Sequence, residues 1–264
     1  MKQRVRDSFS SLLQFAGQGR TVRTITLVAG PPQADGSLGE MLAISADGQT
    51  AGIIVNDDFT RAVLAHAPVR AGDKPDLFGF EYDGDNYRCF YENITPIPKA
   101  VIFGGGHISQ PLAEMLKMLD FRVVVVDDRP DFANSKRFPR ADKVICDSFA
   151  KAAGTLSFDA NTAVIIVTRG HRCDIECLKL VLPFRTKYLG MIGSRRRVNT
   201  ILSGLIEDGA DQERIKEIRS PIGLDIGAQT PAEIAVSIVA EIIADFRGAE
   251  SDCSLSRKGG CRHG

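Results

Sequence analysis

The sequence has no net charge and no long apolar run, and each of these absences excludes a class of protein. Lys plus Arg and Asp plus Glu both total 33 in the 264 residues, so the broad basic field expected of a general nucleic-acid binder is missing. No segment approaches the run of about eighteen apolar residues that a membrane helix needs. The apolar stretch near the start is also too short for a secretory signal. We therefore expect a cytoplasmic protein that binds neither nucleic acid nor membranes.

Cysteine is sparse as well, since the chain has only six. That number is too small for a disulfide scaffold in a chain of this length. In a reducing compartment the six are free thiols, metal ligands or reactive groups. His171, Cys173 and Cys177 form the pattern H-x-C-x3-C, which suits a soft metal. The four-residue spacing on an expected helix instead favours a packed, inert Cys177, and we assign no metal site.

The first part of the chain carries the signals of an antiparallel β domain. Residues 21–28 are rich in β-branched side chains and predict a strand. Asp47-Gly48 and Asp83-Gly84 each lie between two apolar segments, which is the pattern of a β-hairpin. A short helix is expected at 11–15. The sequence therefore predicts an N-terminal, mostly antiparallel β domain over 1–97.

After Pro96 and Pro98, which mark a linker, short apolar strands alternate with helices. Uninterrupted apolar strands are typical of a parallel sheet covered on both faces. We expect five strands, at 100–103, 123–126, 143–145, 163–167 and 188–192. Thr230, followed by Pro231 and Glu233, predicts a capping box at the start of the final helix. The fold class is α/β: a Rossmann-like doubly wound parallel sheet of order 3-2-1-4-5 over 98–248, with a flexible tail over 249–264.

A glycine-rich loop follows the first of these strands. Gly104 and Gly106 fit the pattern G-x-G-x-x-G, although Ser109 stands in place of the third glycine. Glycines let the backbone approach a pyrophosphate, whose charge is favoured at a helix N-terminus. Asp127 ends the next strand, where an acid can bind a ribose 2′-hydroxyl, and the nearby Arg129 weakens that preference. We favour a nucleotide or related phosphate ligand over a tight turn with no ligand.

Residues 168–174, which follow the fourth strand, form a second loop with functional potential. In a sheet of order 3-2-1-4-5 this loop faces the glycine loop across the switch point. Arg169 is then a candidate anion clamp, and His171 a candidate acid, base or ligand. The alternative, which we hold equal, is a helix start with Asp174 as its capping or first-turn acid.

The third loop runs from Gly193 through Ser194 into three consecutive arginines, beginning with Arg195. Exposed amides and guanidinium groups suit a phosphate or another anion. The alternative is a solvated basic turn. Because arginine at a helix start is unfavourable without a counter-ion, we favour anion binding.

Together, these loops resemble the XdhC/CoxI family of xanthine dehydrogenase accessory proteins. The matching stretches are VIFGGGHISQPLAEML (101–116), VVVVDDRPDF (123–132), RFPRAD (137–142), TRGHRCD (168–174), YLGMIGSRRR (188–197) and PIGLDIGAQTPAEIAVSIVAEIIA (221–244). The first domain matches less well. Residues 52–56 stand where the family has a triple glycine, and Cys89 is not followed by glycines. Cys173 also stands where relatives have His.

The resemblance implies an accessory or maturation factor for a molybdenum hydroxylase of the xanthine dehydrogenase type. Such a factor binds the molybdenum cofactor, a molybdopterin, or a nucleotide, and assists sulfuration and insertion. The implied partners are the hydroxylase client and a sulfur-donating desulfurase. It is more a cofactor-binding chaperone than a catalyst. The apolar final helix fits a homodimer or other homo-oligomer, and core packing explains it equally well.

We place the cofactor site on Gly104, Gly106, His107, Asp127, Asp128, Arg129, Thr168, Ser194 and Arg195. The candidate catalytic residues are His171, Arg169 and Cys89. Two other functions remain open. One is an NAD(P)-dependent oxidoreductase, in which Arg169 clamps the substrate and His171 moves the proton. The other is a non-catalytic nucleotide-sensing Rossmann module that changes its partner contacts when an NAD(P)-like dinucleotide binds.

Overall fold

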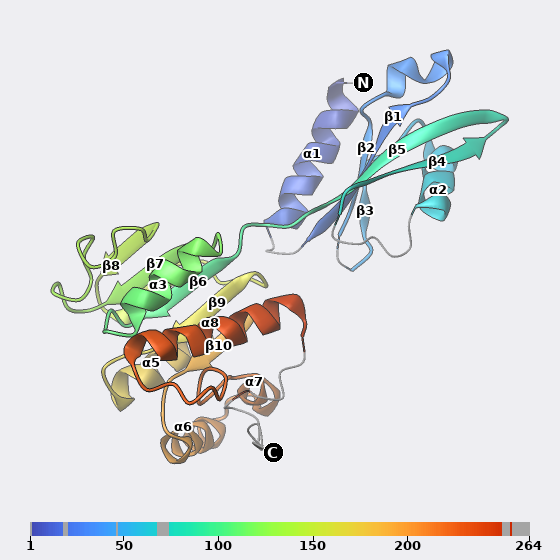
Figure 1. Ribbon diagram of the computed structural model, residues 1–264. Helices are drawn as coiled ribbons and strands as arrows, with labels where there is room; N and C mark the ends of the chain where they lie inside the picture. Colours follow the sequence, from blue (N-terminus) through green and yellow to red (C-terminus); the bar gives the residue numbers. More distant parts are fainter. Residues whose placement is uncertain (1, 18–20, 46, 68–73, 250–253, 255–264) are drawn as a thin grey trace. The chain divides into compact units, whose positions relative to one another are not determined.

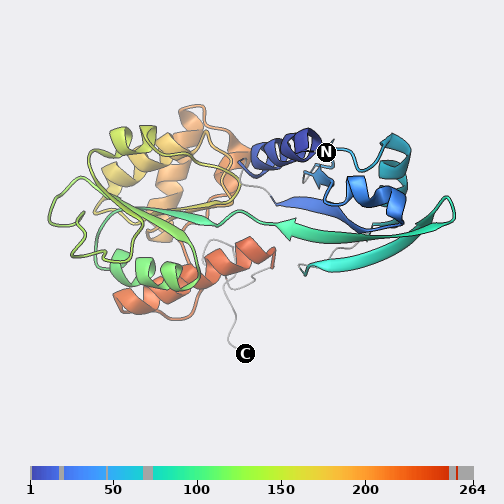
Figure 2. The ribbon, with the colours of Figure 1, turned by 90° about the horizontal axis from the view of Figure 1, so that it is seen from above.

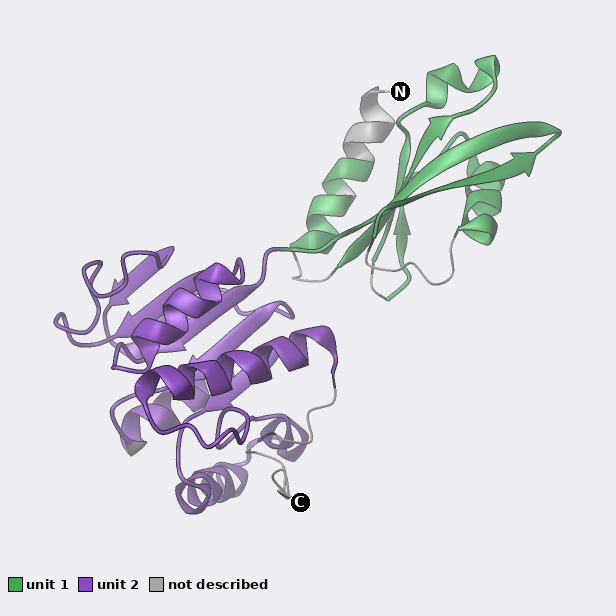
Figure 3. Ribbon diagram, viewed as in Figure 1, with its two compact units in different colours: residues 1–96 green, residues 97–264 purple. Residues whose placement is uncertain are grey.

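The computed structural model describes residues 2–17, 21–45, 47–67, 74–249 and 254, and the side chains of 2–7, 11 and 171 lie outside the description. The chain divides into two compact units, Met1–Pro96 and Ile97–Gly264 (Figure 3). Each unit has its own apolar core. The predicted tail over 249–264 is described only at residues 249 and 254.

Unit 1 is built on a five-stranded antiparallel sheet with the order β3-β2-β1-β5-β4 (Figure 1). The strands are β1 (Val22–Ala29), β2 (Met41–Ile44), β3 (Thr50–Ala51), β4 (Asp76–Tyr82) and β5 (Asp85–Ile94). The helices are α1 (Lys2–Ala16) and α2 (Asp57–His66), with a short 3-10 helix at Pro32–Ser37. Asp83 and Gly84 both have positive φ, 51° and 82°, as a two-residue hairpin turn requires. The antiparallel sheet and its β4–β5 hairpin are therefore as predicted.

Two elements of unit 1 differ from the prediction. Helix α1 has 15 residues rather than the five expected. Phe9 and Leu13 are exposed while Ser8 and Leu12 are buried, so polarity does not mark the buried face of this helix. Strand β3 was expected to run to residue 55 but has two residues. It stops because Gly52 has a φ of 99°, which turns the chain away from β2 and toward α2.

Unit 2 is a five-stranded parallel sheet with the order β10-β9-β6-β7-β8. Its strands are β6 (Lys99–Phe103), β7 (Arg122–Asp127), β8 (Lys143–Cys146), β9 (Thr162–Ile166) and β10 (Tyr188–Met191). Its helices are α3 (Ser109–Met118), α4 (Phe149–Gly154), α5 (His171–Val181), α6 (Arg195–Glu207), α7 (Gln212–Lys216) and α8 (Pro231–Arg247). Numbered within the unit, the order is 5-4-1-2-3, which confirms the predicted doubly wound sheet.

Helices cover both faces of this sheet, as Figure 2 shows from above. Ala100 and Ile102 of β6 pack against α3 and α8, whereas Val101 and Phe103 pack against α4 to α7. Burial of both faces explains why the strands appear in the sequence as uninterrupted apolar runs. The switch point lies between β6 and β9, where crossovers depart to opposite faces.

Helix α8 starts as predicted. The Thr230 hydroxyl accepts a hydrogen bond from the Glu233 amide, and the Glu233 carboxylate accepts one from the Thr230 amide, which completes the capping box. The helix ends at Arg247, and Gly248 caps it with a φ of 65°. Within the described residues, no helix combines the length and the apolar character needed to cross a membrane.

Candidate functional site

The three glycines of the loop between β6 and α3 differ in how much space a side chain would have at each position. A Cβ on Gly104 would lie 2.4 Å from the Val167 carbonyl oxygen, and one on Gly105 would lie 2.3 Å from the Phe132 carbonyl oxygen. The fold itself therefore requires these two. A Cβ on Gly106 would meet no atom within 4 Å, and Gly106 does not have positive φ. Open space at Gly106 leaves its backbone accessible to a ligand at the start of α3.

Ser109, which replaces the third glycine of the nucleotide-binding pattern, supports the loop. Its side chain is fully buried, and its hydroxyl donates a hydrogen bond to the Gly104 carbonyl oxygen at 2.6 Å. This bond satisfies a buried backbone acceptor in the turn between strand and helix. The departure from the glycine pattern thus preserves the loop rather than disrupting it.

Asp127, at the end of β7, is bound to the glycine loop and to Arg129. Its carboxylate accepts from the Gly105 amide at 2.8 Å and from Arg129 Nε and Nη2 at 2.8 and 2.9 Å. Burial alone would raise the pKa of Asp127, but the hydrogen bonds from Arg129 and Gly105 outweigh it and hold the pKa below its ordinary value. Asp127 is therefore a buried anion that fixes the glycine loop.

An ion pair connects the loops on either side of β6. Arg169, after β9, donates from Nη2 to Asp128, after β7, at 2.9 Å. Since β6 pairs with both β7 and β9, this contact spans the carboxyl end of β6. The structure thus brings the second predicted loop to the loop after β7, and both partners of the ion pair remain partly exposed. The second loop also lies against the glycine loop, since a Cβ on Gly104 would be 3.0 Å from Thr168 Cα.

The third loop is joined to the second by Asp174. This buried carboxylate accepts from Thr168 Oγ1 and from Arg197. Asp174 is therefore the counter-ion of one of the three arginines that open α6. Arg195 and Arg196 are exposed, and among the described residues neither forms an ion pair. Their charges remain available to an anion.

The remaining predicted site residues lie in several environments. His107 is exposed in the turn before α3, and Ser194 caps α6 by accepting from the Arg197 amide at 3.4 Å. The side chain of His171 lies outside the described residues, so its predicted role has no geometry here. Cys89 is fully buried in the core of unit 1, where burial raises its pKa to about 12. A protonated, enclosed thiol has no open position for a metal or a sulfur transfer.

Cys173 and Cys177, which lie within the described residues, form no metal site there. Cys177 is fully buried against the sheet, and burial raises the pKa of its thiol. Cys173, one turn before it, is half-buried. Across the part of the chain that the structure describes, no three His, Cys, Asp or Glu side chains gather to hold a metal.

Some residues at the carboxyl ends of the strands, which we call the carboxyl edge of the sheet, were not predicted from the sequence. Arg137 donates from Nη2 to the Gly105 carbonyl oxygen at 3.2 Å and to Gln110 Oε1 at 3.0 Å. The guanidinium carbons of Arg129 and Arg137 lie 3.7 and 5.1 Å from the centre of the Phe132 ring. Arg137 is separated from Gly105 by 32 positions, so no local sequence pattern indicates that contact. The only signal was that Phe132 and Arg137 fall within stretches that match the family.

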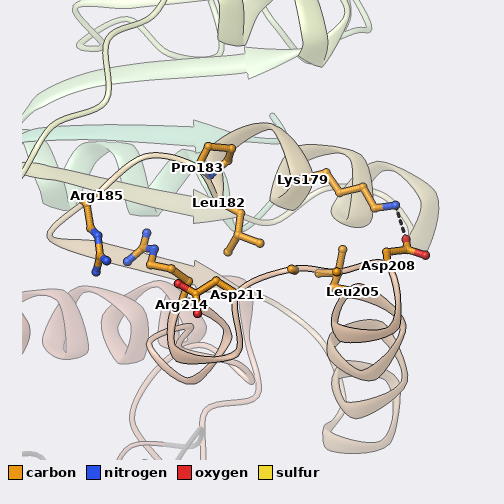
Figure 4. Close-up of a pocket in the computed structure, with 10 residues that line it drawn as sticks. Lys179, Leu182, Pro183, Arg185, Leu205, Asp208, Asp211 and Arg214 are labelled. Atoms are coloured by element: carbon orange, nitrogen blue, oxygen red, sulfur yellow. Dashed lines mark hydrogen bonds and ion pairs between the residues drawn. The ribbon is translucent and has the colours of Figure 1, made fainter.

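Surface depressions occur at both edges of the sheet. One of about 510 Å³ lies between the ends of α5 and α6, where Lys179 and Asp208 point toward each other (Figure 4). It lies away from the loops described above, because α5 begins at the carboxyl edge and ends at the opposite one. A smaller depression of about 190 Å³ is lined by residues 222 and 224–228, before α8, and by Ile234 and Ser237 of α8. The Ile222 amide donates to the carbonyl oxygen of Met191, which ends β10, so this depression belongs to the carboxyl edge.

Comparison with known proteins agrees with this fold. A protein of Bacillus subtilis (strain 168) described as a probable xanthine dehydrogenase subunit is 34% identical over 156 residues, which are 59% of this chain and 45% of that protein. The molybdenum cofactor insertion chaperone PaoD of Escherichia coli (strain K12) is 30% identical over 114 residues, 43% of this chain and 36% of that protein. The chain thus spans less than half the length of these curated relatives.

A crystal structure of a xanthine dehydrogenase from Bacillus halodurans superposes with a TM-score of 0.66 and 24% identity, covering 92% of this chain and 67% of that one. This likeness shows a shared fold. The model of the XdhC Rossmann domain matches residues 100–242, which include all three loops and helix α8 up to Ile242. Since that match covers more than half of the chain, the protein belongs to the XdhC Rossmann domain family.

Proposed function

We propose that this protein is an accessory factor of a molybdenum hydroxylase and binds the molybdenum cofactor at the carboxyl edge of the parallel sheet. The observation that carries the proposal is the open space at Gly106. This glycine is required neither by neighbouring atoms nor by its backbone angle, yet it lies in the loop that leads into α3, near the helix N-terminus where a phosphate is favoured. A binding site explains that glycine, whereas the packing of the loop does not.

The charges of the edge suit an anionic cofactor. Asp127, Asp128 and Asp174 are each bound to an arginine, whereas Arg195 and Arg196 have no acidic partner among the described residues. The edge therefore offers two free guanidinium groups and exposed amides, which bind phosphate oxygens well. The exposed polar side chains of Ser194, which precedes α6, and of His107, which precedes α3, add further hydrogen-bonding groups. When bound, the cofactor would supply the molybdenum centre on which the client depends.

The names of the relatives support a role in maturation. The E. coli relative is called a cofactor insertion chaperone, and the B. subtilis relative a probable subunit of xanthine dehydrogenase. We propose that this chain likewise delivers its cofactor to a hydroxylase of that type and assists its sulfuration. A sulfur-donating desulfurase would then be a second partner. The buried thiols of Cys89 and Cys177 favour an external sulfur donor over a sulfur carried by either of them.

The experiment is thermal unfolding of wild-type protein and Gly106→Ala, each with and without isolated molybdenum cofactor. A ligand that binds only the folded state raises the midpoint with the logarithm of its excess. We expect Gly106→Ala to unfold at nearly the wild-type temperature without ligand, because its new Cβ has room. The methyl group would block the ligand, so the shift seen with wild type should be lost.

Gly154→Ala is the matched control, since Gly154 also has no atom within 4 Å of its added Cβ and lies at the end of α4. It should keep the full shift. A wild-type protein that shows no shift with the cofactor would overturn the proposed function. An equal shift in Gly106→Ala would remove the glycine loop from the site.

A further inference from the structure

Asp127 has no acceptor capacity left for a ligand. Oδ1 accepts from the Arg129 amide at 3.1 Å and from Arg129 Nε at 2.8 Å. Oδ2 accepts from the Gly105 amide at 2.8 Å and from Arg129 Nη2 at 2.9 Å. A carboxylate offers about four lone-pair sites, and here all are used. The residue is also only 1% exposed.

Arg129 is held in place from several sides. Its guanidinium carbon lies 3.7 Å from the centre of the Phe132 ring, within the range of a cation–π contact. Its Nε also lies 3.9 Å from Asp128 Oδ1. The pair with Asp127 is bidentate, the geometry that arginine forms best and lysine cannot reproduce. Arg129 therefore covers Asp127 as part of a packed arrangement.

This arrangement conflicts with the way in which Rossmann domains recognise NAD. The acid at the end of the second strand accepts hydrogen bonds from the ribose hydroxyls. In this chain that acid is Asp127, and a ribose would first have to displace both guanidinium donors. Displacing them would break the bidentate bond of Arg129 to Asp127. The site thus has the shape of a dinucleotide site without its ribose acceptor.

We propose that the Asp127–Arg129 pair determines specificity by excluding NAD-type ribose recognition. The ligand is then held through a phosphate group at Gly106 and the free arginines of α6, with no requirement for a ribose diol. The inference rests on the proposed function for the location of the site. It narrows the ligand class to phosphate esters that bind without hydrogen bonds from a ribose to Asp127. Arg129 is a positioning residue in this account, since it acts through Asp127.

A gain of function tests the proposal. NADH is titrated into wild-type protein, Arg129→Ala and Arg129→Gln, and its binding is followed by nicotinamide fluorescence. Loss of the guanidinium frees Asp127, so we expect at least tenfold tighter NADH binding in both variants than in wild type. Adding Asp127→Asn to Arg129→Ala should abolish the gain. Arg140→Ala, an exposed arginine of the same segment, should behave as wild type.

Wild-type protein that binds NADH as tightly as the variants would overturn the proposal. So would a folded Arg129→Ala or Arg129→Gln without any gain, with folding checked by circular dichroism. Arg129→Gln keeps the side chain as far as Cδ and one amide donor group, which protects the test against simple collapse of the loop. The titration uses no molybdenum cofactor, so its failure is separate from a failure of the proposed function, which the cofactor shift in wild type decides.

Discussion

At the scale of single residues, the thiols differ most in their access to solvent. Cys89 is fully buried with its pKa raised to about 12, whereas Cys146 is exposed at the end of β8. Only a thiolate attacks an alkylating reagent. At about pH 8, iodoacetamide should therefore label Cys146 quickly and Cys89 only after unfolding, as measured by mass spectrometry of peptides.

The same labelling in denaturant serves as the control, because every thiol should then react. Labelling of Cys89 at the rate of Cys146 in native protein would contradict the buried position of this thiol. It would also return Cys89 to the set of residues that can contact sulfur or metal.

At the scale of elements, α8 begins with a complete capping box. Thr230→Ala removes the hydroxyl that accepts from the Glu233 amide and should lower the free energy of unfolding by about 1 kcal/mol. Urea unfolding measures this change. Thr200→Ala is the control, because Thr200 is exposed within α6 and its hydroxyl donates to the Arg196 carbonyl oxygen rather than capping a helix. Equal effects of the two substitutions would show that the cap contributes nothing special.

Elements that are marked by a strong local sequence pattern were predictable from the sequence. The buried strands of unit 2 and the cap of α8 are local patterns, and both appear as expected. Contacts between distant residues were not predictable. Asp127 reaches Gly105 across 22 positions and Asp174 reaches Arg197 across 23, and no pattern in the sequence encodes such partners. The site loops could be found, but the saturation of Asp127 could not.

At the scale of the whole molecule, the paired carboxylates make the free energy of unfolding depend on pH. The pKa of Asp127 and that of Asp142 are both lowered from 3.8, since bonds from Arg129 and Lys117 outweigh the effect of burial. A lowered pKa in the folded state gives stability that is present above about pH 4 and lost as the pH falls through the folded value. Arg129→Ala should therefore be less stable than wild type at neutral pH, and this difference should shrink below about pH 4.

Urea midpoints between about pH 7 and pH 3 measure this difference. A gap that stays constant over the range would show that the pair contributes through packing on Phe132 rather than through charge. Arg140→Ala is again a suitable comparison, because its partner Glu114 is exposed and 3.5 Å away.

The three acid–arginine pairs at the carboxyl edge also have a consequence for how the chain can change over generations. Loss of one member leaves its partner as an unpaired charge, and Asp127 and Asp174 are both buried. Descendants of this sequence should therefore replace both members of a pair together, Asp127 along with Arg129 and Asp174 along with Arg197. The exposed Asp128–Arg169 pair is free of that constraint, so we expect substitutions at the carboxyl edge to accumulate first at these two positions.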